Sequence, residues 1–113
     1  MTLDDIVKKL DLKVRTGASE LNREVTRGYV SDLMSDVIAH GREGDLWITL
    51  QTHQNVVAVA VMKSLSGIIL VNDREPQADT IQKAEAESMP IMISGLPTFE
   101  LVGRLFAMGL LGL

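Results

Sequence analysis

The second half of the chain alternates short apolar runs with helical patterns, and this alternation limits the fold more than any other feature. Residues 46–50, 67–71 and 91–93 are apolar runs of strand length. Helical patterns follow the last two, over residues 77–88 and from Pro97 onward. Strands that alternate with helices form parallel βαβ units, because the chain must cross over before each new strand.

The segment NVVAVAVM at residues 55–62 has two interpretations. Its valines favour a strand, whereas its length and the capping residue Thr52 before it favour a buried helix. We predict a helix, because two parallel strands need a crossover and no other segment can bridge Leu50 and Gly67.

The chain begins with a helix signal followed by two strand signals. Thr2 and Asp5 form a capping pattern for a helix over residues 2–10. β-Forming residues at 12–15 and 24–30 flank a link rich in turn residues. We expect these two segments to form a pair of short strands.

A further helix is expected before the βαβ units. Ser31 can cap it, Asp32 suits its first turn, and Gly41 is placed to end it. The predicted fold class is therefore α/β, with a small, mostly parallel sheet, βαβ crossovers and helices on its faces. A short N-terminal helix and strand pair precede this sheet, and 113 residues suit a single domain over residues 1–113.

The composition excludes several functional classes. A formal charge of −4 leaves no basic surface for nucleic acid or an anionic membrane. The absence of cysteine excludes disulfides and thiolate metal sites. MTLDDIVKKL does not resemble a secretory signal, and no apolar run reaches the roughly 20 residues of a membrane span. We therefore expect a cytoplasmic protein that binds neither nucleic acid nor membrane.

Polar side chains gather after each of the three apolar strands. Ligands of open parallel sheets bind beyond the carboxyl ends of the strands, where helices begin with unpaired N–H groups. The densest polar run, QTHQN at residues 51–55, could orient a polar ligand or could cap the following helix. The candidate ligand-binding residues are Thr52, His53, Asn55, Asn72, Asp73, Ser94, Gly95 and Thr98.

A few residues are candidates for chemistry or for the core. His53 can be a general base, a pH switch or a hydrogen-bonded structural residue. Its spacing from His40 matches no metal motif, so we expect neither a metal nor a cofactor. Asp32 and Asp36 form a carboxylate pair or a solvated face of the predicted helix. Trp47 is expected in the core or an interface.

Residues 44–110, which begin GDLWITLQTHQN and end LVGRLFAMGL, resemble the DRTGG domain in order, spacing and residue class. The stretches LKV, RGYVSDLMSD and PTFE extend the resemblance. The namesake Asp-Arg pair falls on Thr52 and His53, and the Thr-Gly-Gly on Val71, Asn72 and Asp73. These substitutions remove a fixed charge and add side chains where glycines would let a ligand approach the backbone.

The resemblance implies a regulatory or dimerising module. DRTGG domains occur in some CBS-domain pyrophosphatases and phosphotransacetylases. They also occur as small stand-alone proteins similar to the N-terminal region of HPr kinase. Where such proteins are enzymes, catalysis belongs to neighbouring domains.

The first functional hypothesis is a non-catalytic regulatory module. It would sense a small polar ligand, such as a nucleotide or phosphorylated metabolite, or form a homodimer, or do both. The apolar tail with Leu110, Leu111 and Leu113 either contributes to association or completes the packing of the last helix.

Two alternatives belong to other functional classes. The chain could be an adaptor that docks onto a partner enzyme and binds no small molecule. It could also be a small transferase or hydrolase that uses His53 with Asp73 or Asp36. The sequence supports this last hypothesis least, because it contains no phosphate-binding loop, dinucleotide motif or nucleophile elbow.

Overall fold

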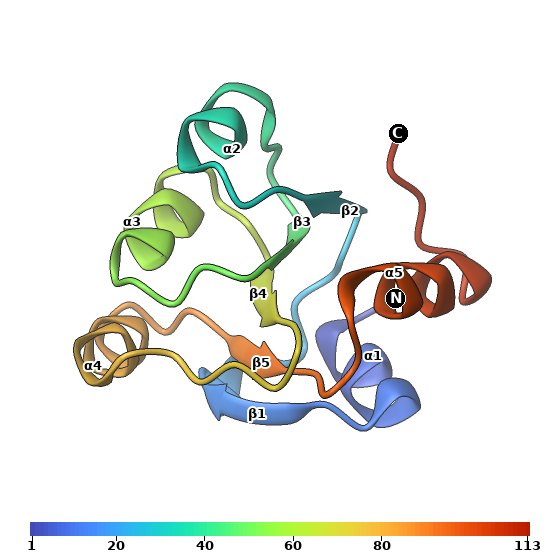
Figure 1. Cartoon of the computed structure of the whole chain (residues 1–113), viewed down its shortest axis with the longest axis horizontal. Coiled ribbons are helices and arrows are strands. Elements are labelled where there is room, and N and C mark those ends of the chain that lie inside the picture. Colours follow the sequence, from blue (N-terminus) through green and yellow to red (C-terminus); the bar gives the residue numbers. More distant parts are fainter.

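The apolar runs of the chain form one sheet of five strands. The strands are β1 (Lys13–Thr16), β2 (Arg27–Val30), β3 (Asp45–Thr49), β4 (Gly67–Leu70) and β5 (Ile91–Ile93). The computed structural model describes residues 1–113. In its sheet, the strands lie side by side in the order β1-β5-β4-β3-β2 (Figure 1). β2 to β5 run parallel, and β1 is antiparallel to β5. The predicted α/β class with a mostly parallel sheet is confirmed.

Helices cover both faces of this sheet (Figure 1). α1 (Leu3–Leu10) and α5 (Thr98–Ala107) lie on one face. α2 (Met34–His40), α3 (Asn55–Met62) and α4 (Ala78–Ala86) lie on the other. A 3₁₀ turn (Ala18–Glu20) lies between β1 and β2. None of these helices is long and apolar enough to cross a membrane.

The central strand β3 is buried on both faces. Leu46 and Ile48 belong to the core beneath α1 and α5, whereas Trp47 between them belongs to the core beneath α2, α3 and α4. The exposure of these three side chains does not exceed 1%. The indole N–H of Trp47 donates to the Ser31 carbonyl at 2.8 Å. The predicted core position of Trp47 is therefore confirmed.

The ambiguous segment of valines is a helix, as predicted. α3 occupies residues 55–62 and packs between α2 and α4. Val56, Val57, Val59 and Ala60 are buried. A helix that is apolar on nearly all sides belongs in the interior of a domain, and this position between two helices and the sheet meets that need.

The expected pairing of the first two strands with each other is wrong, although both strands exist. β1 and β2 lie at opposite edges of the sheet. The Thr16 hydroxyl donates to the Met89 carbonyl at 2.8 Å and accepts from the Ile91 amide at 2.9 Å, which fixes β1 beside β5. The next residue, Gly17, has φ 68°, and a Cβ there would lie 2.7 Å from Pro90 Cα. These long-range contacts decide the pairing.

The two helices of the first half confirm the predicted segments, with one changed boundary. Thr2 and Asp5 form a reciprocal capping box at α1. α2 ends before Gly41, as predicted, but it begins at Met34. Ser31 does not cap this helix at its first turn. Its hydroxyl accepts from the Leu33 amide at 3.1 Å, in a turn that precedes α2.

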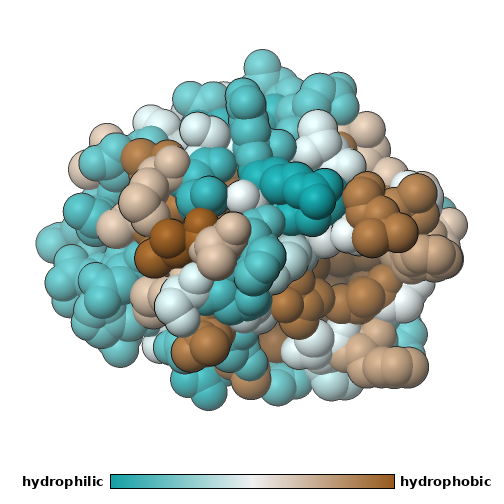
Figure 2. All heavy atoms as spheres, turned by 90° about the horizontal axis from the view of Figure 1, so that it is seen from above, coloured by the Kyte–Doolittle hydropathy of each residue, from teal (hydrophilic) through white to brown (hydrophobic).

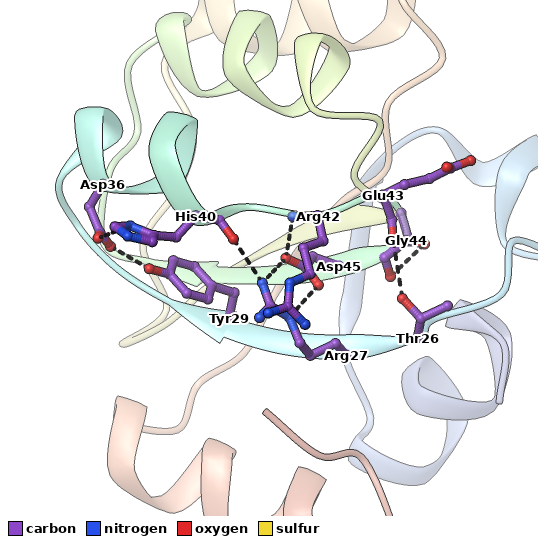
Figure 3. A network of polar contacts seen from close by, with 10 residues as sticks. Thr26, Arg27, Tyr29, Asp36, His40, Arg42, Glu43, Gly44 and Asp45 are labelled. Carbon is purple, nitrogen blue, oxygen red and sulfur yellow. Dashed lines mark hydrogen bonds and ion pairs between the residues drawn. The ribbon is translucent and has the colours of Figure 1, made fainter. Parts of the chain in front are cut away.

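A buried ion pair joins β2 to β3 (Figure 3). Nε and Nη2 of Arg27 donate to the two carboxylate oxygens of Asp45 at 2.8 and 2.7 Å. The side chains are 8% and 0% exposed. Nη2 also donates to the His40 carbonyl, and the Arg42 amide donates to Asp45. The hydrogen bond with Asp45 raises the pKa of Arg27 further above its ordinary value. The pair therefore ties the end of α2 to both strands.

Replacement of Arg27 by methionine tests this pair. Arg27→Met leaves the buried carboxylate of Asp45 without its partner, which should lower the free energy of unfolding by about 3–5 kcal/mol. Urea denaturation followed by circular dichroism measures the change.

The matched control is Arg15→Met, which removes a partly exposed ion pair with Glu75. It should cost less than about 1 kcal/mol. The double variant Arg27→Met/Asp45→Leu should recover much of the loss, because no charge is then left buried. Equal losses for Arg27→Met and Arg15→Met would contradict the assigned role of the buried pair.

Candidate functional site at the carboxyl edge of the sheet

The loops after β4 and β5 are joined by backbone hydrogen bonds. The Asn72 amide donates to the Leu96 carbonyl at 3.0 Å, and the Asp73 amide donates to the Ser94 carbonyl at 2.8 Å. Ser94 is buried, and its hydroxyl accepts from the Leu96 amide. The structure thus brings Asn72 and Asp73 beside Ser94, while Ser94 itself has a structural role.

The loop after β3 reaches the same edge through its backbone. The Thr52 carbonyl accepts from the Gln77 amide at 3.2 Å and from the Thr80 hydroxyl at 2.8 Å. His53 Nδ1 accepts from the Asn55 amide at 3.1 Å, where α3 begins. A neutral ring in this arrangement carries its proton on Nε2. His53 therefore has a hydrogen-bonded role at the helix start, and its ring is exposed.

Several side chains at this edge are free to meet a ligand. Asn55, Asn72 and Asp73 are exposed, and their side chains make no hydrogen bond within the chain. A Cβ at Gly95 would find no atom within 4 Å, so the backbone there faces open space. Thr98 is half-buried at the start of α5. None of the three cavities in the molecule is lined by the predicted site residues, so this edge is an open surface.

An ion-pair clamp that the sequence did not predict holds the loop after β4. Arg15 Nε and Lys13 Nζ of β1 donate to the Glu75 carboxylate at 2.8 and 3.1 Å. The hydrogen bond from Arg15, followed by that from Lys13, lowers the pKa of Glu75 below its ordinary value. The two cationic residues at alternate positions of β1 were the only sequence signal for these ion pairs, because 60 or more residues separate them from Glu75.

The prediction that Asp32 and Asp36 share a helix face is wrong, because α2 begins after Asp32. The Asp32 carboxylate accepts from the Thr49 hydroxyl at 2.9 Å and from the Leu50 amide at 2.7 Å, and so closes the end of β3. Asp36 accepts from the Tyr29 hydroxyl at 2.8 Å and lies 3.2 Å from His40 Nδ1 (Figure 3). The hydrogen bond from Tyr29 is the main cause that lowers the pKa of Asp36.

The geometry does not assemble the acid–base pair of the enzyme hypothesis. Asp36 bonds to Tyr29 and His40, and no ion pair or hydrogen bond joins His53 to Asp73. No three histidine or carboxylate side chains lie close enough together to hold a metal ion. His53 therefore has no carboxylate partner at this edge of the sheet.

The sequence matches the model of one protein family over most of its length. The model of the DRTGG domain matches residues 5–108. The chain belongs to the DRTGG domain family. The resemblance stated from the sequence is thereby confirmed, and none of the curated proteins matches the chain.

A solved structure of a DRTGG protein has the same fold. It contains the CBS and DRTGG domains of the regulatory region of Clostridium perfringens pyrophosphatase, complexed with the activator diadenosine tetraphosphate. The TM-score is 0.74 at 17% sequence identity. The match covers 96% of this chain and 47% of that chain, so this chain spans about half the length of the solved protein.

The two residues that the sequence predicts at the namesake glycine positions have a glycine-like backbone. Asn72 and Asp73 have φ 56° and 57°. This left-handed conformation is natural for glycine, and Asn and Asp tolerate it better than other residues. The turn is therefore formed without glycine, and it carries two polar side chains.

Substitutions at Asn72 test this interpretation. Asn72→Val should lower the free energy of unfolding by about 1–2 kcal/mol, because a β-branched residue is strained at positive φ. Asn72→Gly removes the same exposed side chain without strain and should change stability by less than about 0.5 kcal/mol. Urea denaturation measures the free energy of unfolding of both variants. Equal losses of stability would show that backbone strain at positive φ is not the cause.

Proposed function

We propose that this chain is a non-catalytic regulatory module that binds a nucleotide or phosphorylated metabolite at the carboxyl edge of its sheet. The observation that carries the proposal is the start of α5. The amides of Thr98, Phe99 and Glu100 donate no hydrogen bond within the chain. Unpaired amides and the helix dipole favour a phosphate group at such a position. The open backbone at Gly95 leaves room for its approach.

The turn beside α5 adds groups that suit the rest of such a ligand. Arg74 is exposed and forms no ion pair, so it is available as a counter-charge for phosphate. The carboxylate of Asp73 and the amide of Asn72 can bond hydroxyl or amino groups. His53 and Asn55 lie at the neighbouring start of α3. The activator bound to the pyrophosphatase regulatory region is a nucleotide, which supports this ligand class.

Thermal unfolding in the presence of ligands tests the proposal. Diadenosine tetraphosphate, ATP, ADP, AMP and acetyl phosphate are compared at increasing concentration. A ligand that binds only the folded state, at a free concentration of about 100 times its Kd, raises the free energy of unfolding by about 2.7 kcal/mol. We expect a concentration-dependent rise in Tm with at least one compound, which Arg74→Ala and His53→Ala reduce.

Two matched variants control for general effects of charge and histidine. Arg104→Ala removes an exposed arginine on α5, and His40→Ala removes the other histidine. Both should leave the ligand-induced shift unchanged. No shift with any compound, or a shift that only Arg104→Ala abolishes, would count against this site.

We also propose that the module forms a homodimer through the outer side of α5. Phe99 and Phe106 are 92% and 63% exposed, and Val102 lies between them at helical spacing. Large exposed aromatic side chains on one helix face are typical of an interaction surface. Within the apolar tail, Leu110 packs into the core, whereas Leu111 is exposed.

Sedimentation velocity over a range of protein concentrations tests association. The wild-type protein should shift from monomer to dimer, and Phe106→Asp should remain monomeric at every concentration. Ala107→Asp, at an adjacent exposed position, controls for the added charge. A wild-type monomer at all concentrations would instead favour the adaptor hypothesis, in which α5 contacts a different protein.

A further inference from the structure

The segment that follows α5 lies along the open edge of β2. β2 is an edge strand and pairs only with β3. The Gly28 amide donates to the Leu111 carbonyl at 2.9 Å. Leu110 is 6% exposed and belongs to the core beneath α1 and α5. Residues 109–113, here called the strap, therefore contact this edge through Leu110 and Leu111 without forming a sixth strand.

The strap makes few attachments to the edge that it covers. Gly109 turns the chain away from α5 with φ 102°. Beyond Leu110, the contact with Gly28 is the one backbone hydrogen bond between the strap and the sheet. Leu111 is 54% exposed. Segments with so little burial and hydrogen bonding open at a much lower free energy than central strands.

The edge beneath the strap has a further donor that is not used. Amides along a strand point alternately to the two sides. The Ser31 amide donates to Ile48 of β3, so Tyr29 also faces β3, while Gly28 and Val30 face outward. Only Gly28 has an acceptor on that side. Val30 therefore offers an open N–H to an added strand.

An apolar cavity of about 270 Å³ lies beside this edge. Figure 2 shows apolar side chains gathered around a hollow on this face. β2, β3, α5 and the strap all line it, with Val30, Ile48, Val102, Leu105 and Phe106 among its walls. The strap does not fill it, since more than half of Leu111 faces solvent.

Gly28 allows the close approach of the strap. A Cβ at this position would lie 3.3 Å from Leu110 Cδ2. The edge is thus shaped to accept a leucine side chain next to a backbone carbonyl. An extended peptide can use the same contacts and can add the Val30 amide and the cavity to them.

We propose that the edge of β2 binds an extended apolar segment of a partner protein, and that the strap is the internal occupant which this segment displaces. The strap itself specifies the partner's chemistry. A leucine enters the position of Leu110, the following carbonyl accepts from Gly28, and the next apolar side chain enters the cavity. This surface is separate from the ligand site at the carboxyl ends of the strands, so either of these two can fail without the other. It shares Val102 and Phe106 with the proposed dimer face.

The experiment loosens the strap in the full chain and offers its own sequence as the probe. Leu110→Ala weakens the anchor in the core. The probe is the acetylated and amidated peptide MGLLGL, which corresponds to residues 108–113, and the control peptide is MGDLGL. Hydrogen exchange of the Gly28 and Val30 amides is followed by NMR, with Ile69 in β4 as an internal reference for global stability.

In Leu110→Ala, the Gly28 amide should exchange about tenfold faster or more while Ile69 remains protected. MGLLGL should restore protection of Gly28 and add protection at Val30, whereas MGDLGL should do neither. The wild-type protein should bind MGLLGL at least about tenfold more weakly, because its strap competes.

Leu111→Asp keeps the experiment decisive if Leu110→Ala unfolds, because Leu111 lies outside the core. It should also speed the exchange of Gly28 and permit protection by MGLLGL. Rapid Gly28 exchange that the peptide never slows would overturn the proposal. If either variant forms a dimer that does not bind the peptide, a second copy of the chain occupies the edge of β2. This result would also overturn the proposal.

Discussion

The burial of β3 and β4 on both faces is the constraint on which the other elements depend. Strands with apolar side chains on both sides must be covered twice, so helices have to occupy both faces of the sheet. α3 supplies the crossover between these strands and fills the interior of one layer. At the margin of this core, Arg27 and Asp45 hold β2 in place, because each buried charge requires the other.

The parallel order of the strands also creates the candidate site. β3, β4 and β5 end at the same edge, and backbone hydrogen bonds between their loops satisfy the groups that would otherwise be unpaired. The backbone is used in this way at Asn72 and Asp73, so their side chains remain free. The amides at the start of α5 remain free as well. An edge of this kind offers a ligand hydrogen bonds without an enclosed cavity.

α5 contributes to all three surfaces that we assign to function: the ligand site, the dimer face and the cavity beside β2. Its first turn faces the candidate ligand site, and its later turns carry Phe106 and line the cavity beside the strap. If a ligand at one end and a partner along the side each prefer a particular position of this helix, their binding is coupled, and the coupling is reciprocal. A regulatory module needs such a link between an input and an output.

Local chemistry let the sequence alone predict a large part of this protein. Periodicity and a capping box predicted α1, and periodicity predicted the alternation of strands and helices. The need for a crossover between two parallel strands predicted the helical NVVAVAVM segment. Because parallel strands end on the same side of a sheet, the residues after these strands were expected to lie together. Three features were decided by the tertiary structure alone. They are the separation of β1 from β2, the ion pairs of Arg15 and Lys13 with Glu75, and the hydrogen bond from the Gly28 amide to the Leu111 carbonyl. These features join residues far apart in the chain. Their partners depend on which apolar surfaces are buried together, and no local pattern encodes that choice.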